Sequence, residues 1–146
     1  MTRQQIESSM NNIVEQAHAL AKRDAREKTM TLGEIIFVLE KCDPTHNVWY
    51  AFGSLRPDGL DSYRGVYSQL ALGYAEEGDP VNVADLLKEC KEAVGKTFTG
   101  YKGGDFVMDK STPVWISNYG KASETGIDRI VGDKYNVKIF ANEIED

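Results

Sequence analysis

Two short loops of this sequence combine a tyrosine, a basic residue and glycine. They are Ser62–Gly65 (SYRG) and Gly100–Gly104 (GYKGG). A tyrosine ring can stack on a base and a cation can contact a phosphate, while glycine lets backbone N–H groups approach a ligand closely. Together these properties suit a small anionic, nucleotide-like ligand. The candidate ligand-binding residues are therefore Tyr63, Arg64, Gly65, Tyr101, Lys102, Gly103 and Gly104.

A third group of similar character follows in the segment Trp115–Gly120. Trp115 and Tyr119 supply rings, and the Asn118 amide can both donate to and accept from a base edge. The alternative is structural, because tyrosine beside glycine is common in β-turns, and such short patterns have many false positives. Three such groups in one small acidic chain favour binding in loops.

The usual catalytic and metal-binding patterns are not found. His18 and His46 have no cysteine or carboxylate at metal-ligand spacing. No nucleophile elbow, P-loop or dinucleotide-binding glycine pattern occurs. Catalysis by Asp105 and Asp109 alone stays open, but nothing in the sequence favours it. We therefore expect no enzyme, no metal and no cofactor.

Length, charge and hydropathy limit the remaining classes. The 146 residues suit a single domain, 1–146, with 41% hydrophobic and 27% charged content. A formal net charge of −6 disfavours generic nucleic-acid binding. The longest apolar run, Ile35–Leu39, is far shorter than the ~20 residues of a membrane span, and the N-terminus lacks the apolar region of a signal peptide. Cys42 and Cys90 are interpreted as reduced thiols, so we expect a cytoplasmic protein that does not engage membranes.

The N-terminal segment 1–28 has the pattern of an amphipathic helix. Thr2 and Gln5 form a capping box, and apolar residues recur at helical spacing to about Ala25. This helix either packs on the domain or pairs with its copy in a homodimer or higher homo-oligomer. Residues 30–141 form the expected α+β core, and 142–146 an acidic tail.

Two further helices are expected within that core. A capping box at Thr31–Glu34 starts a helix that runs to about Lys41, and Asn82 caps another that ends at Gly95. Between them, aromatic and branched residues predict a strand at 48–52. Pro57-Asp58-Gly59 predicts a turn within a loop at 54–61, and a strand, or less readily a helix, follows at 66–74.

The last third of the chain is β-rich and punctuated by glycine. Strands are expected at 106–108, 114–116, 127–131 and 135–140, with a two-residue hairpin turn at Gly132-Asp133. These elements predict an α+β fold in which two or three helices pack on one face of a mainly antiparallel sheet.

Several of these segments resemble small proteins encoded by tailed bacteriophages. The resemblance spans roughly Met30–Tyr119 and rests on Thr31–Glu34, Ser62–Tyr67, Leu70-Ala71, Val83–Leu87 and Thr97–Gly104, which include the SYRG and GYKGG motifs. It implies a phage protein in the host-cell cytoplasm and carries over no biochemical role or site residue.

In that setting we expect an anti-defence sponge that sequesters a cyclic nucleotide or cyclic ADP-ribose-type immune messenger. The alternatives are an inhibitor that binds a host or defence enzyme, and a phage accessory or structural protein.

Overall fold

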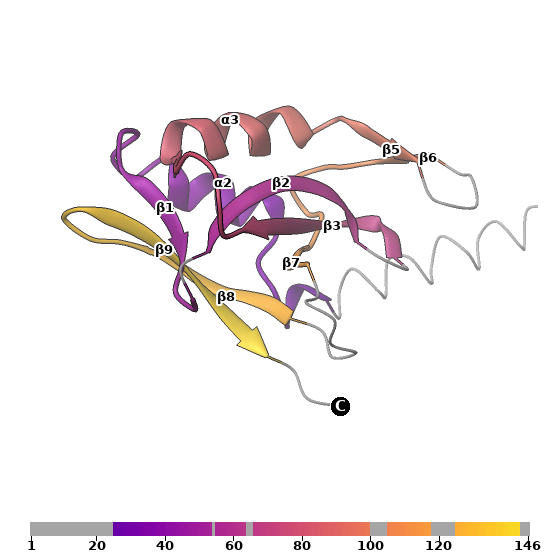
Figure 1. Cartoon of the computed structure of the whole chain (residues 1–146). Helices are drawn as coiled ribbons and strands as arrows, with labels where there is room; N and C mark the ends of the chain where they lie inside the picture. The colour runs from indigo at the N-terminus through magenta and orange to yellow at the C-terminus, as the bar shows by residue number, and fades with distance from the viewer. Residues whose placement is uncertain (1–24, 54, 64–65, 100–104, 118–124, 144–146) are drawn as a thin grey trace, which may run out of the picture.

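The computed structural model describes residues 25–53, 55–63, 66–99, 105–117 and 125–143 (Figure 1). The predicted N-terminal helix lies almost entirely outside these residues, as do 144–146 of the predicted tail. The elements in chain order are α2 (Leu32–Leu39), β1 (Asn47–Tyr50), β2 (Arg56–Tyr63), β3 (Val66–Ala75), β4 (Val81–Asn82), α3 (Val83–Ala93), β5 (Thr97–Thr99), β6 (Asp105–Val107), β7 (Val114–Ile116), β8 (Thr125–Gly132) and β9 (Asn136–Glu143).

The main sheet of the described residues has seven strands in the order β2-β3-β7-β8-β9-β1-β4. Two pairings, β1 with β9 and β3 with β7, are parallel, and the others are antiparallel. The α+β class is confirmed. Since β1 and β2 lie near opposite ends of this order but are only five residues apart in the chain, the sheet must curl. The curl brings the Tyr50 hydroxyl of β1 across to β3, where it donates to the Gly73 carbonyl at 2.8 Å.

Helix α2 starts as the sequence predicts. Thr31 accepts from the Glu34 N–H, and the Glu34 carboxylate accepts from the Thr31 N–H. Just before the helix, Met30 bridges two strands that barely pair with each other: its N–H donates to Ile127 of β8, and its carbonyl accepts from Val114 of β7. The segment that leads into α2 therefore lies between β7 and β8 and is hydrogen-bonded to both strands.

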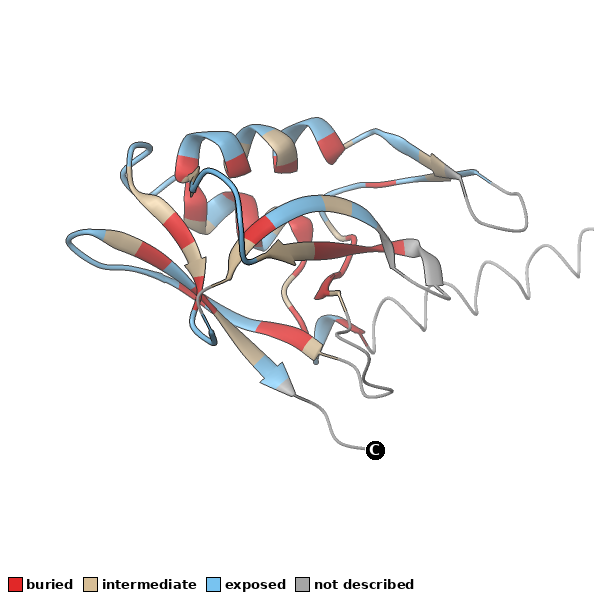
Figure 2. Ribbon diagram, viewed as in Figure 1, coloured by how far each residue is buried: buried red, intermediate tan, exposed pale blue. Residues whose placement is uncertain are grey.

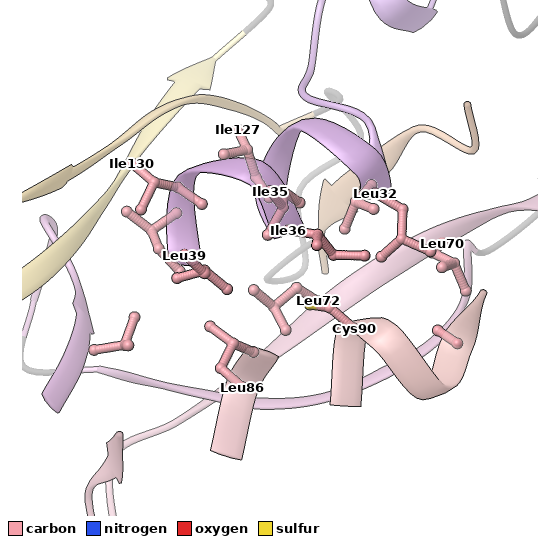
Figure 3. Packing of buried hydrophobic residues seen from close by; sticks show 14 of the residues in the cluster. Leu32, Ile35, Ile36, Leu39, Leu70, Leu72, Leu86, Cys90, Ile127 and Ile130 are labelled. Atoms are coloured by element: carbon pink, nitrogen blue, oxygen red, sulfur yellow. The ribbon is translucent and has the colours of Figure 1, made fainter. Parts of the chain in front are cut away.

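The two helices pack together on the concave side of the sheet. Helix α3 is capped by Asn82, and Gly95 follows its C-terminus at φ 82°, as predicted. Figure 3 shows Leu39 of α2 facing Leu86 of α3, with Ile130 of β8 beside them. The apolar residues buried in this core are Leu32, Ile35, Ile36, Leu39, Val48, Tyr50, Leu70, Leu72, Val83, Leu86, Cys90, Ala93, Met108, Val114, Ile116, Ile127, Ile130, Val137 and Ile139.

The predicted loop at 54–61 is wrong. Pro57, Asp58 and Gly59 lie inside β2, where the register with β3 shifts between Pro57 and Leu60. Gly59 has a φ of 80°, so the glycine allows a β-bulge rather than a turn. Across the pair, a Cβ on Gly73 would lie 2.4 Å from the Asp58 carbonyl oxygen, so the bulge also needs glycine on β3.

The predicted turn at Gly132-Asp133 is displaced. Gly132 remains in β8, and the Asp133 N–H donates to the Asn136 carbonyl at 2.8 Å, which leaves Lys134 and Tyr135 at the tip. The Asp133 carboxylate accepts from the backbone N–H groups of Asn136 and Tyr135, and these bonds lower its pKa. An aspartate side chain, not glycine, therefore closes this hairpin.

Candidate functional site

The first tyrosine motif lies at the end of the β2–β3 hairpin. Tyr63 is the last residue of β2 and is paired with Val66, the first residue of β3. Arg64 and Gly65 lie outside the described residues. The second motif connects β5 to β6, whose last described pair is Thr99 with Asp105. Tyr101, Lys102, Gly103 and Gly104 also lie outside the described residues.

The two hairpins that carry these motifs are neighbours. Strand β5 contacts both β2 and β3, and β6 contacts β3. Phe98 and Phe106 are half-buried and pack against the core cluster, which anchors the β5–β6 hairpin. In Figure 1 the two hairpins point toward the same, right-hand end of the molecule. The fold thus brings together two elements that the sequence separates.

Trp115 does not lie at a surface open to a ligand. Its side chain is 2% exposed and packs with Ala25 and Ala71. The indole N–H donates to Gln69 Oε1 at 2.6 Å. This burial argues against the stacking role predicted for Trp115, because neither face of the ring is accessible to a base.

Strand β7 also ends away from the first tyrosine motif. The Ser117 N–H donates to the Leu72 carbonyl, and β7 runs parallel to β3. Leu72 lies six residues beyond Val66, which corresponds to about 20 Å along a strand. Asn118 and Tyr119 come next in the chain and lie outside the described residues.

A groove of about 300 Å³ separates strand β2 from helix α3. Glu89 of α3 is hydrogen-bonded to the edge of β2, where its carboxylate accepts from the Leu60 N–H at 2.8 Å. The groove is lined by Arg56, Pro57, Asp58, Gly59, Val81, Asp85, Leu86 and Glu89. Three carboxylates and one guanidinium give it an excess of negative charge, so it suits a cationic group better than a phosphate. Sequence patterns did not indicate this site, because its two sides are far apart in the chain.

A smaller cavity, of about 150 Å³, adjoins the start of β8. It is lined by Arg26, Glu27, Lys28, Thr29, Met30, Glu34, Ile127, Asp128 and Asn142. Its charges are mixed and its volume is below the range of typical small-molecule sites. We assign it no ligand.

His46 and Asp109, which were considered above for metal binding and catalysis, both interact with residues close to them in the chain. His46 Nε2 lies 3.5 Å from Asp43 Oδ2, and the Asp43 pKa is lowered mainly by a hydrogen bond from the Thr45 hydroxyl. Asp109 Oδ1 accepts from the backbone and hydroxyl of Ser111. Within the described ranges, no three His, Cys, Asp or Glu side chains are grouped to hold a metal.

The two cysteines are free thiols with different surroundings. Burial raises the pKa of Cys90 to about 12 and also raises the pKa of the half-buried Cys42. A thiol with a raised pKa is a poor nucleophile, since the thiolate is the reactive form.

Comparison with models of known protein families, with curated protein sequences and with solved structures finds no match to this chain. Within the part of the chain that the structure describes, no helix has both the length and the apolar character needed to cross a membrane.

Proposed function

We propose that this protein binds and sequesters a small anionic, nucleotide-like ligand where the β2–β3 and β5–β6 hairpins lie together. In this role Tyr63 and Tyr101 stack on bases, and Arg64 and Lys102 contact phosphates. The observation that supports the proposal is the contact of β5 with β2 and β3, because one pocket requires both motifs at one end of the molecule. Trp115 is not part of the proposed site.

The ligand class follows from the chemistry of the motifs. Two rings and two cations match a molecule with two bases or rings and negatively charged phosphates. Cyclic dinucleotides have this composition, whereas cyclic ADP-ribose-type immune messengers have one adenine and a pyrophosphate and would stack on one of the two rings. A sponge in a phage-infected host cell would bind such a messenger without changing it.

Thermal unfolding with a panel of cyclic di- and trinucleotides and cyclic ADP-ribose isomers tests the proposal. A ligand at about 100 times its Kd adds about 2.7 kcal/mol to the free energy of unfolding, or about 5–10 °C in Tm for a domain of this size. An unchanged Tm with every member of the panel would reject the proposed ligand class.

Paired variants then locate the site. Arg64→Ala with Lys102→Ala should abolish the Tm shift and leave the Tm of the free protein unchanged. A matched control, Lys88→Ala with Lys110→Ala, removes the same charge from exposed positions elsewhere and should keep the shift. If the control pair loses the shift equally, the effect is one of net charge and the hairpin site is wrong.

A second candidate is a protein-binding inhibitor of a host or defence enzyme. The acidic groove between β2 and α3 favours it, because three carboxylates share its lining with one guanidinium, and Asp85 lies there where a basic side chain of a partner can bind. This candidate predicts co-purification with a host protein that Asp85→Asn weakens. Arg64→Ala with Lys102→Ala would leave that complex intact, so the two candidates are separable.

A further inference from the structure

The outer face of strands β8, β9 and β1 carries aromatic and basic side chains in two adjacent rows. In the first row, Trp49 of β1 is paired with Lys138 of β9, which is paired with Val131 of β8. In the second row, Phe140 of β9 is paired with Arg129 of β8. Five side chains from three strands therefore share one face.

These side chains point away from the core. Val137 and Ile139 alternate with them along β9 and are fully buried on the concave side. Lys138 and Arg129 are exposed, while Trp49 and Phe140 are half-buried. Figure 2 shows buried and exposed residues alternating along the β8–β9 hairpin. Both helices lie on the side of the sheet opposite this outer face. The two described helices therefore leave this face uncovered.

The two rows place two aromatic residues beside basic residues. The Arg129 guanidinium lies 4.2 Å from the centre of the Phe140 ring, so it forms a plane stacked on an aromatic ring. The Trp49 indole lies one strand away, with Lys138 next to it. Bases stack both on aromatic rings and on arginine planes, and a lysine ammonium beside them can contact a phosphate.

Two carboxylates, Asp128 and Asp133, lie near this face and keep their negative charge. Asp128 forms an ion pair with Arg129 at 2.5 Å, and Asp133 accepts two backbone hydrogen bonds at the hairpin tip. Lys134 adds a cation at the same tip. Arg129, Lys134 and Lys138 therefore exceed these two carboxylates by one charge, and screening over about 8 Å makes this local balance matter more than the net charge of −6.

We propose that this outer face binds a short single strand of nucleic acid, with one base on Trp49 and the next on the Arg129–Phe140 pair. The convex outer face of the curled sheet cannot enclose a free nucleotide, since small-molecule sites are concave and cover most of their ligand. It can present successive bases of a strand to successive side chains, as aromatic sheet faces do. This surface is separate from the hairpin site proposed above and does not depend on it.

Fluorescence anisotropy with a labelled oligothymidylate of about ten nucleotides tests the proposal on the full chain. Arg129→Ala with Lys138→Ala should weaken binding about tenfold or more. The control pair Lys88→Ala with Lys91→Ala, two exposed lysines of α3, should not. With two phosphate contacts, log K should fall with log salt at a slope of about −1.4.

Three outcomes would overturn the proposal. The first is no binding at low salt. The second is equal weakening in the control pair, which would indicate non-specific charge attraction. The third is competition by thymidine monophosphate as effective, mole for mole, as the unlabelled oligonucleotide, which would indicate a site for a free nucleotide. Circular dichroism of each variant confirms that the fold is retained, because both changes on the outer face are at exposed positions.

Discussion

The concave and outer faces of the curled sheet are made by alternate residues of the same strands, yet they differ in chemistry. On β9, Val137 and Ile139 are fully buried beneath the helices, whereas Lys138 and Phe140 face outward. The concave face is mostly apolar, and the hydroxyl of its Tyr50 side chain donates to the Gly73 carbonyl. The outer face carries rings and charges that contact one another, such as Arg129 with Phe140 and Asp128, without being buried in the core.

This difference predicts that substitutions on the concave face lower stability more than substitutions on the outer face. Burial of apolar surface supplies most of the stability of a small domain, so the concave face should be sensitive to substitution. Exposed positions usually change stability by less than about 0.5 kcal/mol, so the exposed positions of the outer face should tolerate substitution. The following substitutions test this division.

Leu39→Ala should have the largest effect. Leu39 is fully buried between the helices and the sheet, and its truncation should lower the free energy of unfolding by about 2–5 kcal/mol because it leaves a cavity. Phe37→Ala, on the same helix but 60% exposed, is the matched control and should cost less than about 1 kcal/mol. Urea denaturation measures both, and equal losses would contradict the division between faces.

Thr29→Ala should have an intermediate effect at the seam where β7 and β8 separate. The buried Thr29 hydroxyl donates to the Val114 carbonyl at 2.5 Å and accepts from the Ile127 N–H at 2.7 Å. Removing it leaves both backbone groups without that partner, at a cost of about 1–3 kcal/mol. Thr29→Ser keeps the hydroxyl and should restore most of the loss. A serine variant as unstable as the alanine variant would show that the methyl group, not the hydrogen bonds, matters.

Arg129→Ala with Lys138→Ala should have the smallest effect on folding. The ion pair of Arg129 with Asp128 is solvent-exposed and is worth about 0–1 kcal/mol, and the stack on Phe140 adds a similar amount. Chemical denaturation should therefore give nearly the wild-type midpoint. A loss comparable to that of Leu39→Ala would mean that the outer face is structural, and the binding inference there would fail.

Local signals in the sequence predicted the helices well. The capping box at Thr31 and the Asn82 cap define both helix starts, and Gly95 marks the end of α3. Each of these depends on a few neighbouring residues, which is why sequence alone is enough. Helix α2 is the exception at its end, since it stops at Leu39 rather than near Lys41.

Features that depend on distant partners could not be predicted. Pro57-Asp58-Gly59 has turn chemistry, but pairing of β2 with Gly73 and its neighbours on β3 makes it a bulge. Leu87 and Val94 have the spacing of buried residues, yet the structure leaves them only half-buried. The parallel pairing of β1 with β9 has no local signature at all.

The candidate site likewise has parts that local sequence motifs predict and parts that depend on distant contacts. Short motifs pointed to Tyr63 and Tyr101. Only the fold shows that the two hairpins carrying these motifs are neighbours. The same reasoning grouped Trp115 with them, because its ring looks alike in sequence whether it is exposed or buried. Its contact with Gln69 comes from β3 and could not be anticipated.

Backbone-amide NMR during titration with the cyclic nucleotide and cyclic ADP-ribose panel tests the central claim most directly. The proposal predicts that one ligand shifts the resonances of residues at the hairpin ends, including Tyr63, Val66, Thr99 and Asp105, and leaves those of Lys138 and Phe140 on the outer face unchanged. No shift with any ligand, or shifts confined to residues away from both hairpins, would contradict it.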